Sequence, residues 1–278
     1  MKLHIAFSGG KTSGYMTKLL LDKVAFLYED VKVVFANTGQ ENEATLDFVH
    51  RCDKEFGFNV VWVEANVLSN VKGVGTSFKI VDYHTASRDG KPFEDVIRKF
   101  GIPNRTWQIC SRELKANTVR AYLRSLGWRK KDYVSAIGIR HDEIHRISAN
   151  CERDRLIYPL AEWFKVDKMF INTWWATQTF NLTLKEHQGN CKWCWKKSKR
   201  KLLTLANETP EIFEFPARME LMYAKAGNPN RKERAVFFQN YTSTIELLEE
   251  ARRGDFNPFV DKHYDEPNGC SESCEVFQ

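Results

Sequence analysis

The chain has 278 residues, of which 42% are hydrophobic, 28% charged and 13% aromatic, with only 15 glycines and 8 prolines. This composition excludes collagen-like, low-complexity and wholly disordered proteins, and the length suits one large domain or a domain with an appended part. The net charge of +6 is compatible with an anionic ligand without requiring one, and no apolar stretch is long enough to predict a membrane span.

Strand and helix patterns alternate through the first part of the chain. Lys2–Phe7 predicts a short buried strand, and apolar residues then recur at helical spacing over 16–27. Val31–Ala36 and Val60–Val63 predict two further strands, with a helix over 46–56 between them. Because strands joined by helical crossovers pair in parallel, we predict an α/β fold whose sheet has helices on both faces.

The alternation weakens over residues 66–104, where glycines and prolines interrupt the pattern around one expected helix. We predict that this segment is an insertion lying over the sheet. A helix over 114–126 and a strand over 133–139 then resume the alternation. Because the later pattern is mostly helical, we divide the chain into an α/β domain at 1–164 and a helical C-terminal region at 165–278.

A small polar loop separates the first predicted strand from the first predicted helix. Its residues are Ser8, Gly9, Gly10, Lys11, Thr12 and Ser13. Small residues let backbone N–H groups face a phosphate at a helix N-terminus, and the lysine and hydroxyls add charge and donors. The adjacent glycines do not have Walker A spacing, and the alternative is an ordinary turn. We predict a phosphate-binding loop in which Lys11 and Ser13 contribute to catalysis.

Polar residues also follow two other predicted strands, at the edge where open α/β sheets bind ligands. The second strand is followed by Thr38, Gly39 and Glu41. The strand over 133–139 is followed by Arg140, Asp142 and Glu143. This order predicts that Arg140 meets a phosphate and that Asp142 or Glu143 holds Mg²⁺ or a ribose, with Arg140 and Asp142 as catalytic candidates.

These segments together resemble a known family. The Ser8–Ser13 loop looks like the PP-loop of ATP pyrophosphatases in the adenine nucleotide alpha-hydrolase superfamily. The segment Thr38–Val49 is similar to a motif of its phosphoadenosine phosphosulfate (PAPS) reductase branch, as are Gly138–Arg146, which adds Arg146 to the nucleotide-binding set, and Tyr158–Leu160. The resemblance implies a Rossmann-like (HUP-type) parallel sheet, ATP or a related adenine nucleotide on the loop, and chemistry at the α-phosphorus or at an attached sulfate.

Seven cysteines without a signal-peptide pattern predict a reducing, cytoplasmic compartment, where thiols serve as metal ligands or catalytic groups. Cys191 and Cys194 have the C-x-x-C spacing that suits zinc or an iron–sulfur cluster. The separation of Cys110 from this pair is similar to that in cluster-bearing adenylyl-sulfate reductases. We therefore expect a [4Fe-4S] cluster, with Zn²⁺ as the alternative, on Cys110, Cys191 and Cys194, and Cys274 or Cys270 as the candidate fourth ligand.

A basic run, Lys196–Lys201, follows the C-x-x-C pair beside Trp193 and Trp195. Cations next to aromatic rings can follow a nucleic-acid backbone and stack on its bases, whereas the alternative is a solvated helix face. The sequence leaves both open. The candidate partners are therefore an adenine nucleotide, a nucleic-acid acceptor and a sulfur donor or thiol reductant, without a membrane; homo-oligomerisation stays open.

Three functions follow from these observations. In the first, ATP adenylates an acceptor and sulfur then displaces AMP, which the Ser-Gly-Gly-Lys loop and the basic run favour. In the second, a cysteine reduces adenylyl sulfate or its 3′-phosphorylated form, which the Thr38–Val49 segment favours, although the Glu-Cys-Gly-Leu-His tail of sulfonucleotide reductases is missing. The third is a nucleotide-binding accessory protein without turnover. We predict the first.

Overall fold

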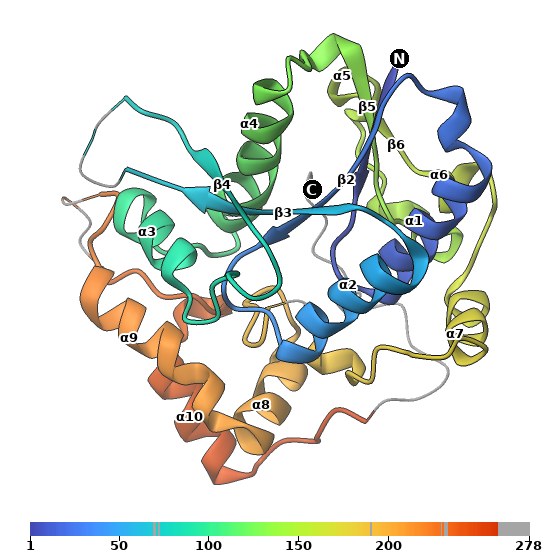
Figure 1. Cartoon of the computed structure of the whole chain (residues 1–278). Coiled ribbons are helices and arrows are strands. Elements are labelled where there is room, and N and C mark those ends of the chain that lie inside the picture. The colour runs from blue at the N-terminus through green and yellow to red at the C-terminus, as the bar shows by residue number, and fades with distance from the viewer. Residues whose placement is uncertain (69–70, 72, 190, 229, 231–232, 261–278) are drawn as a thin grey trace.

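The structure, a computed structural model, describes residues 1–68, 71, 73–189, 191–228, 230 and 233–260. Six strands form one sheet in the order β4-β3-β2-β1-β5-β6 (Figure 1). The strands are β1 (Lys2–Ala6), β2 (Val31–Asn37), β3 (Val60–Asn66), β4 (Ser77–Val81), β5 (Tyr133–Ala136) and β6 (Leu156–Ile157).

Helices connect and surround these strands. The α-helices are α1 (Lys11–Lys23), α2 (Glu43–Phe56), α3 (Lys91–Phe100), α4 (Thr118–Ser125), α5 (Cys151–Asp154), α6 (Pro159–Glu162), α7 (Lys168–Ala176), α8 (Lys199–Glu208), α9 (Glu214–Tyr223) and α10 (Thr244–Arg253). A π-helix, η2 (Cys110–Asn117), leads directly into α4. Short 3-10 turns are η1 (Ala25–Leu27), η3 (Lys130–Asp132), η4 (His141–Arg146), η5 (Glu186–Gln188), η6 (Pro210–Phe213) and η7 (Gln239–Tyr241).

The sheet is parallel except at one edge. Leu3 of β1 lies opposite Val31 of β2 on one side and Val134 of β5 on the other, in parallel register on both. β3 continues the parallel pairing from β2, and β6 continues it from β5. β4 pairs with β3 in antiparallel register. The predicted α/β fold with a mostly parallel sheet and a helical C-terminal region is confirmed.

Two strands are not predicted by the sequence pattern. β4 lies within the segment 66–104, which we expected to lie over the sheet, but which instead extends its edge. Most of its side chains are exposed, so it lacks the apolar run that marks a buried strand. β6 has only two residues, too few for any periodicity. The segment 66–104 also contributes α3, the helix expected there.

Helices cover both faces of the sheet. On one face, α1, α2 and α7 share an apolar core with β1 residues such as Ile5. On the opposite face, α4 packs on residues such as Val34 of β2. The strand order reverses at β1, because β2 and β3 follow it on one side of the sheet whereas β5 and β6 lie on the other side. Open α/β sheets bind ligands outside the carboxyl ends of the strands at such a position.

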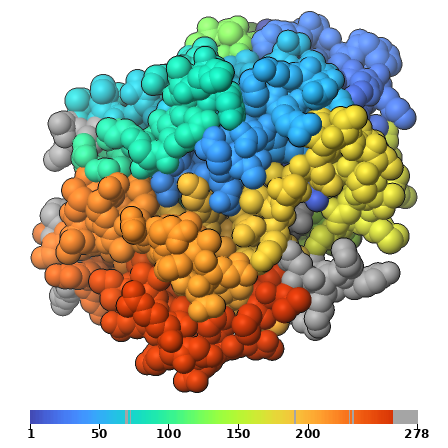
Figure 2. All heavy atoms as spheres, turned by 60° about the horizontal axis from the view of Figure 1, so that its bottom comes forward, coloured from blue at the N-terminus to red at the C-terminus, as the bar shows by residue number. Residues whose placement is uncertain are grey.

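A third core joins the segment after β3 to the C-terminal helices. Phe93 of α3 packs in it with Trp193, with Leu202 of α8 and with Phe213. Figure 2 shows these C-terminal helices, coloured orange to red, directly against the teal and green segment that contains α3, with yellow segments beside them. The chain beyond β6 thus reaches back to the edge of the sheet where β1 and β2 end. The predicted division at residue 164 stays a prediction.

Within the described ranges, no helix combines the length and the apolar character needed to cross a membrane.

Candidate functional site

The loop after β1 is held closed by a side chain of the helix that follows it. The Ser13 Oγ of α1 accepts a hydrogen bond from the Ser8 backbone N–H at 3.2 Å and lies 2.9 Å from the Ser8 Oγ. It also donates to the Gly10 carbonyl at 3.0 Å. Because one buried hydroxyl ties both sides of the turn, the loop is fixed before any ligand arrives.

Gly9 is required by both conformation and space. Its φ is +80°, in the left-handed region that side chains rarely adopt. A Cβ at this position would lie 2.7 Å from the Thr45 Cγ2 and 3.2 Å from the Phe35 ring. Close packing on α2 and β2 therefore explains why position 9 is a glycine. Without a side chain there, the backbone of the loop is exposed at the start of α1.

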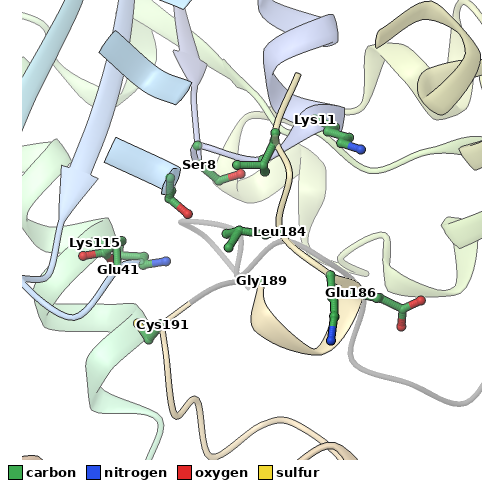
Figure 3. Close-up of a pocket in the computed structure, with 13 residues that line it drawn as sticks. Ser8, Lys11, Glu41, Lys115, Leu184, Glu186, Gly189 and Cys191 are labelled. Atoms are coloured by element: carbon green, nitrogen blue, oxygen red, sulfur yellow. The ribbon is translucent and has the colours of Figure 1, made fainter. Parts of the chain in front are cut away.

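This loop opens onto a cavity formed by segments far apart in the sequence. The cavity is lined by Ser8, Gly9, Gly10, Lys11, Glu41, Thr45, Lys115, Leu182, Leu184, Lys185, Glu186, Gly189 and Cys191. Figure 3 shows Glu41, Lys115 and Cys191 together on one side of Ser8, with Lys11 extending on the other side. N–H groups at a helix N-terminus, with lysines on two sides, suit a polyanionic ligand such as a nucleotide phosphate chain.

The loop after β2 is organised by Glu41. Its carboxylate accepts hydrogen bonds from the Thr38 backbone N–H at 3.0 Å, the Thr38 hydroxyl at 2.8 Å and the Gln40 N–H at 3.2 Å. Gly39 sits in this turn with φ +79°. Three donors on one carboxylate make Glu41 a structural acceptor that shapes the cavity wall.

The C-x-x-C segment is attached to the same loop. Cys191 forms an antiparallel bridge with Glu41, and the Lys192 N–H donates to the Gln40 carbonyl at 2.9 Å. The Trp193 indole N–H donates to the Gln40 Oε1 at 2.6 Å. These contacts bring Cys191 beside the phosphate loop, although the two segments lie in different halves of the chain.

A second cavity adjoins the first and contains the three predicted thiols. It is lined by Thr38, Phe93, Cys110, Ser111, Leu114, Lys115, Cys191, Trp193, Cys194, Trp195 and Lys196. Cys191 and Lys115 line both cavities. Cys110, Cys191 and Cys194 thus line one cavity beside the Ser8–Ser13 loop, and their role as metal ligands stays a prediction.

The π-helix η2 explains how Cys110 and Lys115 reach one cavity. A π-helix hydrogen-bonds at i→i+5, and such turns are frequent at functional sites. Sequence reasoning expected a helix only from Leu114 and gave Lys115 no role. The apolar periodicity of a helix does not reveal a π-turn. The only signal for Lys115 in the sequence is therefore that it lies five positions after Cys110.

Burial and the neighbouring groups both change the pKa of the Cys191 thiol. Burial raises the pKa of the Cys191 thiol well above its usual value, and the Glu41 carboxylate raises it further. Lys115 and the Thr38 hydroxyl, 3.6 Å from the sulfur, lower that pKa. The lysine is thus the cation that favours the thiolate at the boundary between the two cavities.

The chemistry of the three thiols bears on whether they could hold a metal group. Three thiols among apolar walls form a donor set that suits a thiolate-bound iron–sulfur cluster. Among the residues that the structure describes, however, no group of three or more His, Cys, Asp or Glu side chains could hold one metal ion. This finding supports neither the [4Fe-4S] cluster nor the zinc alternative on Cys110, Cys191 and Cys194, and both stay predictions. Cys270 and Cys274 lie outside the described residues.

The residues after β5 contact the Ser8–Ser13 loop outside the cavity. The Arg140 Nη1 donates to the Thr12 hydroxyl at 3.2 Å, and its guanidinium pairs with Asp142 at 3.0 Å and with Glu143 at 3.4 Å. Arg146 pairs with Glu143 at 2.6 Å. None of these four ion-paired side chains is among the described residues that line the cavity. The predicted contacts of Arg140 with phosphate and of Asp142 or Glu143 with Mg²⁺ stay predictions.

The structure buries part of the basic run. Lys197 and Lys201 are each only 2% exposed. Lys197 donates to the Cys191 carbonyl at 3.0 Å, and Lys201 pairs with Glu186. Trp193 and Trp195 are also buried, so neither ring is available to stack on bases. Lys199 and Arg200 remain exposed, so a nucleic-acid contact of the run stays a prediction.

Comparisons with known proteins agree with this geometry. The model of the phosphoadenosine phosphosulfate reductase domain family matches residues 2–166 of the chain. The chain is 29% identical over 281 residues to the uncharacterized nin region protein ORF290 of Escherichia phage lambda, with 98% of this chain and 94% of that protein covered. Two uncharacterized proteins of Methanocaldococcus jannaschii are 26% and 27% identical over 59% and 50% of this chain, which spans 34% and 23% of their lengths.

Proposed function

Because this chain belongs to the phosphoadenosine phosphosulfate reductase domain family, we propose that it binds ATP on the Ser8–Ser13 loop and performs sulfur transfer at the adjoining cysteines. The family relates the chain to nucleotide-dependent sulfur chemistry in general. The choice of ATP and of an adenylated acceptor is our proposal.

One observation carries the proposal. The cavity at the phosphate loop and the cavity lined by three thiols meet at Cys191 and Lys115. A nucleotide held by its phosphates on the loop would thus have both a thiol and a buried cation beside it. An ordinary βα turn would not explain why a C-x-x-C segment is bonded to the neighbouring loop.

The reaction has two steps. An oxygen of the acceptor attacks the α-phosphorus of ATP, an oxygen–phosphorus bond forms and pyrophosphate leaves. A sulfur nucleophile then attacks the activated carbon of the acceptor, a carbon–sulfur bond forms and AMP leaves with the oxygen. The N–H groups at the start of α1 and Lys11 would bind the phosphates, and Mg²⁺ would accompany them. Lys115 would stabilise negative charge that develops between the two cavities.

Cys110, Cys191 and Cys194 would hold a [4Fe-4S] cluster in the second cavity. Bound there, such a cluster would supply iron that can bind sulfur. The Thr38 hydroxyl and Lys115 would then orient the Cys191 sulfur and stabilise its negative charge, because both lie beside it.

The second candidate is a sulfonucleotide reductase, in which a cysteine thiol reduces the sulfate of adenylyl sulfate to sulfite. The family match itself and the thiol beside the phosphate loop favour it. Cys270 and Cys274, the candidates for a tail cysteine, lie outside the described residues.

Product analysis distinguishes these functions. The anaerobically purified protein is incubated either with ATP, Mg²⁺, sulfide and a total RNA preparation as acceptor, or with adenylyl sulfate, its 3′-phosphorylated form and a thiol reductant. We expect AMP and pyrophosphate from ATP, and no release by a Lys11→Ala variant. Sulfite release without ATP cleavage would select the reductase, and tight binding without turnover of either compound would select an accessory protein.

A further inference from the structure

A surface groove unrelated to the nucleotide cavity lies between the loop before η2 and the connection from α9 to α10. One wall is formed by Asn104, Arg105 and Thr106, and the other by residues 234–236 and 238–241. The loop before η2 runs on into Cys110, the first residue of the π-helix. The groove therefore adjoins, along the chain, a segment that reaches the thiol cavity.

The charge of this groove has one sign. Arg105 and Arg234 are both exposed, and among the described residues no acidic side chain pairs with either guanidinium. The described lining includes no aspartate or glutamate, whereas the nucleotide cavity is lined by Glu41 and Glu186. Two guanidinium groups in a groove of this kind favour a ligand with repeated negative charges.

The first wall is rigid before a ligand binds. The Asn104 Oδ1 accepts hydrogen bonds from the Thr106 N–H and the Trp107 N–H, each at 3.0 Å, and from the Thr106 hydroxyl at 2.9 Å. The Trp107 indole N–H donates to the Phe100 carbonyl at 3.0 Å. This turn holds Arg105 at its tip, so little loop entropy is lost when the guanidinium binds.

The second wall is fixed by one buried carboxylate. Glu220 of α9 accepts a hydrogen bond from the Phe237 N–H at 2.9 Å and from the Thr244 N–H at 2.8 Å. Between these two anchors, Asn240 and Tyr241 have φ values of +57° and +56°. Two consecutive left-handed residues other than glycine are costly, and the anchored loop imposes them.

This backbone conformation leaves the ring of Tyr241 exposed to solvent. Tyr241 is 80% exposed at the rim of the groove. A rigid exposed ring beside guanidinium groups is the combination by which proteins bind single-stranded nucleic acid, with phosphates on the cations and a base on the ring. A duplex needs many cations spaced along a wide face to neutralise the phosphates of both strands. The described lining has two arginines, which favours a single strand.

We propose that this groove binds a single-stranded nucleic acid, with Arg105 and Arg234 on its phosphates and a base stacked on Tyr241. The inference rests on the proposed function and deepens it, because it names the class of acceptor that would be thiolated. It places the nucleic-acid surface in this groove rather than on the Lys196–Lys201 run, in which Lys197 and Lys201 are buried.

The test measures binding of a fluorescein-labelled single-stranded oligonucleotide of about 12 nucleotides, a length within the range of single-strand-binding grooves, by anisotropy at several salt concentrations. Tyr241→Ala should weaken binding about tenfold, whereas Tyr241→Phe should retain it, because only the ring is needed. Arg105→Gln combined with Arg234→Gln should weaken it further and reduce the salt slope by roughly 0.7 for each phosphate that is no longer neutralised. Arg153→Gln, an exposed arginine on α5, is the matched control.

The outcomes separate this proposal from its alternatives. Equal binding of heparin and of the oligonucleotide, with no effect of Tyr241→Ala, would overturn it in favour of a general polyanion surface. Binding of a duplex of the same sequence more tightly than the single strand would also overturn it. Lys11→Ala should leave oligonucleotide binding unchanged, so failure of the nucleotide site and failure of the groove are distinguishable.

Discussion

Thr38 and Cys191, 153 positions apart in the chain, are in contact: the Thr38 hydroxyl oxygen lies 3.6 Å from the Cys191 sulfur. Thr38 belongs to the loop after β2, and Cys191 begins the C-x-x-C segment. The same loop forms a wall of the nucleotide cavity through Glu41. The proposed nucleotide cavity and the cavity lined by the three thiols therefore share one boundary.

Lys11→Ala should weaken the binding of a non-hydrolysable ATP analogue by tenfold or more. A hydrogen bond from a charged group contributes about 1.5–3 kcal/mol, and Lys11 lines the cavity without belonging to the core. Ser13→Ala should weaken binding as well, because it removes the hydroxyl that closes the loop. Isothermal titration calorimetry measures both. Lys18→Ala, on the same helix but paired with Asp22, is the control, and unchanged affinity of Lys11→Ala rejects the phosphate-loop assignment.

Gly9→Ala should abolish nucleotide binding and lower stability, and Gly127→Ala separates the two causes. The two glycines have nearly the same φ, +80° and +77°, but a Cβ on Gly127 would meet nothing within 4 Å. In both variants the backbone conformation should cost about 1–2 kcal/mol. Gly9→Ala alone should add about 1–3 kcal/mol for overpacking against Thr45. Urea unfolding gives the free energies, and equal losses in the two variants would argue against the close packing of the loop on α2.

Anaerobic protein should contain iron and sulfide bound by the three converging thiols. Alanine at Cys110, Cys191 or Cys194 should reduce the iron content to background, because each thiol lines the same cavity. Cys151→Ala should keep its iron, since Cys151 does not line that cavity. If Cys274 is not a ligand, Cys274→Ala also keeps it. Quantification of iron, sulfide and zinc is the measurement; stoichiometric zinc in place of iron would contradict the cluster.

Stability should fall below neutral pH because of a histidine inside the sheet. Burial lowers the pKa of His4 from 6.5 to about 3, and its Nδ1 lies 3.0 Å from the Ser135 hydroxyl across the β1–β5 pair. Between these two pKa values the unfolded chain binds a proton that the folded chain does not. The contribution is therefore complete above pH 6.5 and decreases as the pH falls toward 3, by about 1.4 kcal/mol per pH unit.

His4→Asn tests this, because an amide can replace the Nδ1 contact without titrating. Between pH 7 and pH 5 the wild-type protein should lose about 2 kcal/mol more than this variant. Urea unfolding at both pH values gives the difference. His145→Asn, at an exposed position, should behave like the wild-type protein. Parallel pH profiles for the wild-type protein and His4→Asn would show that His4 does not cause the loss.

Much of the nucleotide half of the site could be predicted from the sequence. The strand, the Ser8–Ser13 loop and helix α1 follow one another, and each is specified by residues within a few positions of it. An apolar run, small residues at a tight turn and helical spacing are local signals, so they remain visible without a structure. The α/β fold follows from the repetition of that unit.

The features that only the tertiary structure decided are contacts between residues far apart in the chain. The bridge between Glu41 and Cys191, the meeting of two cavities at Lys115 and the burial of Lys197 and Lys201 leave no periodic trace in the sequence. A lysine that serves the interior and one that faces solvent look the same in a basic run, because burial is fixed by whatever packs against it. The sequence therefore determined which chemical groups the protein has, and packing determined which of them meet.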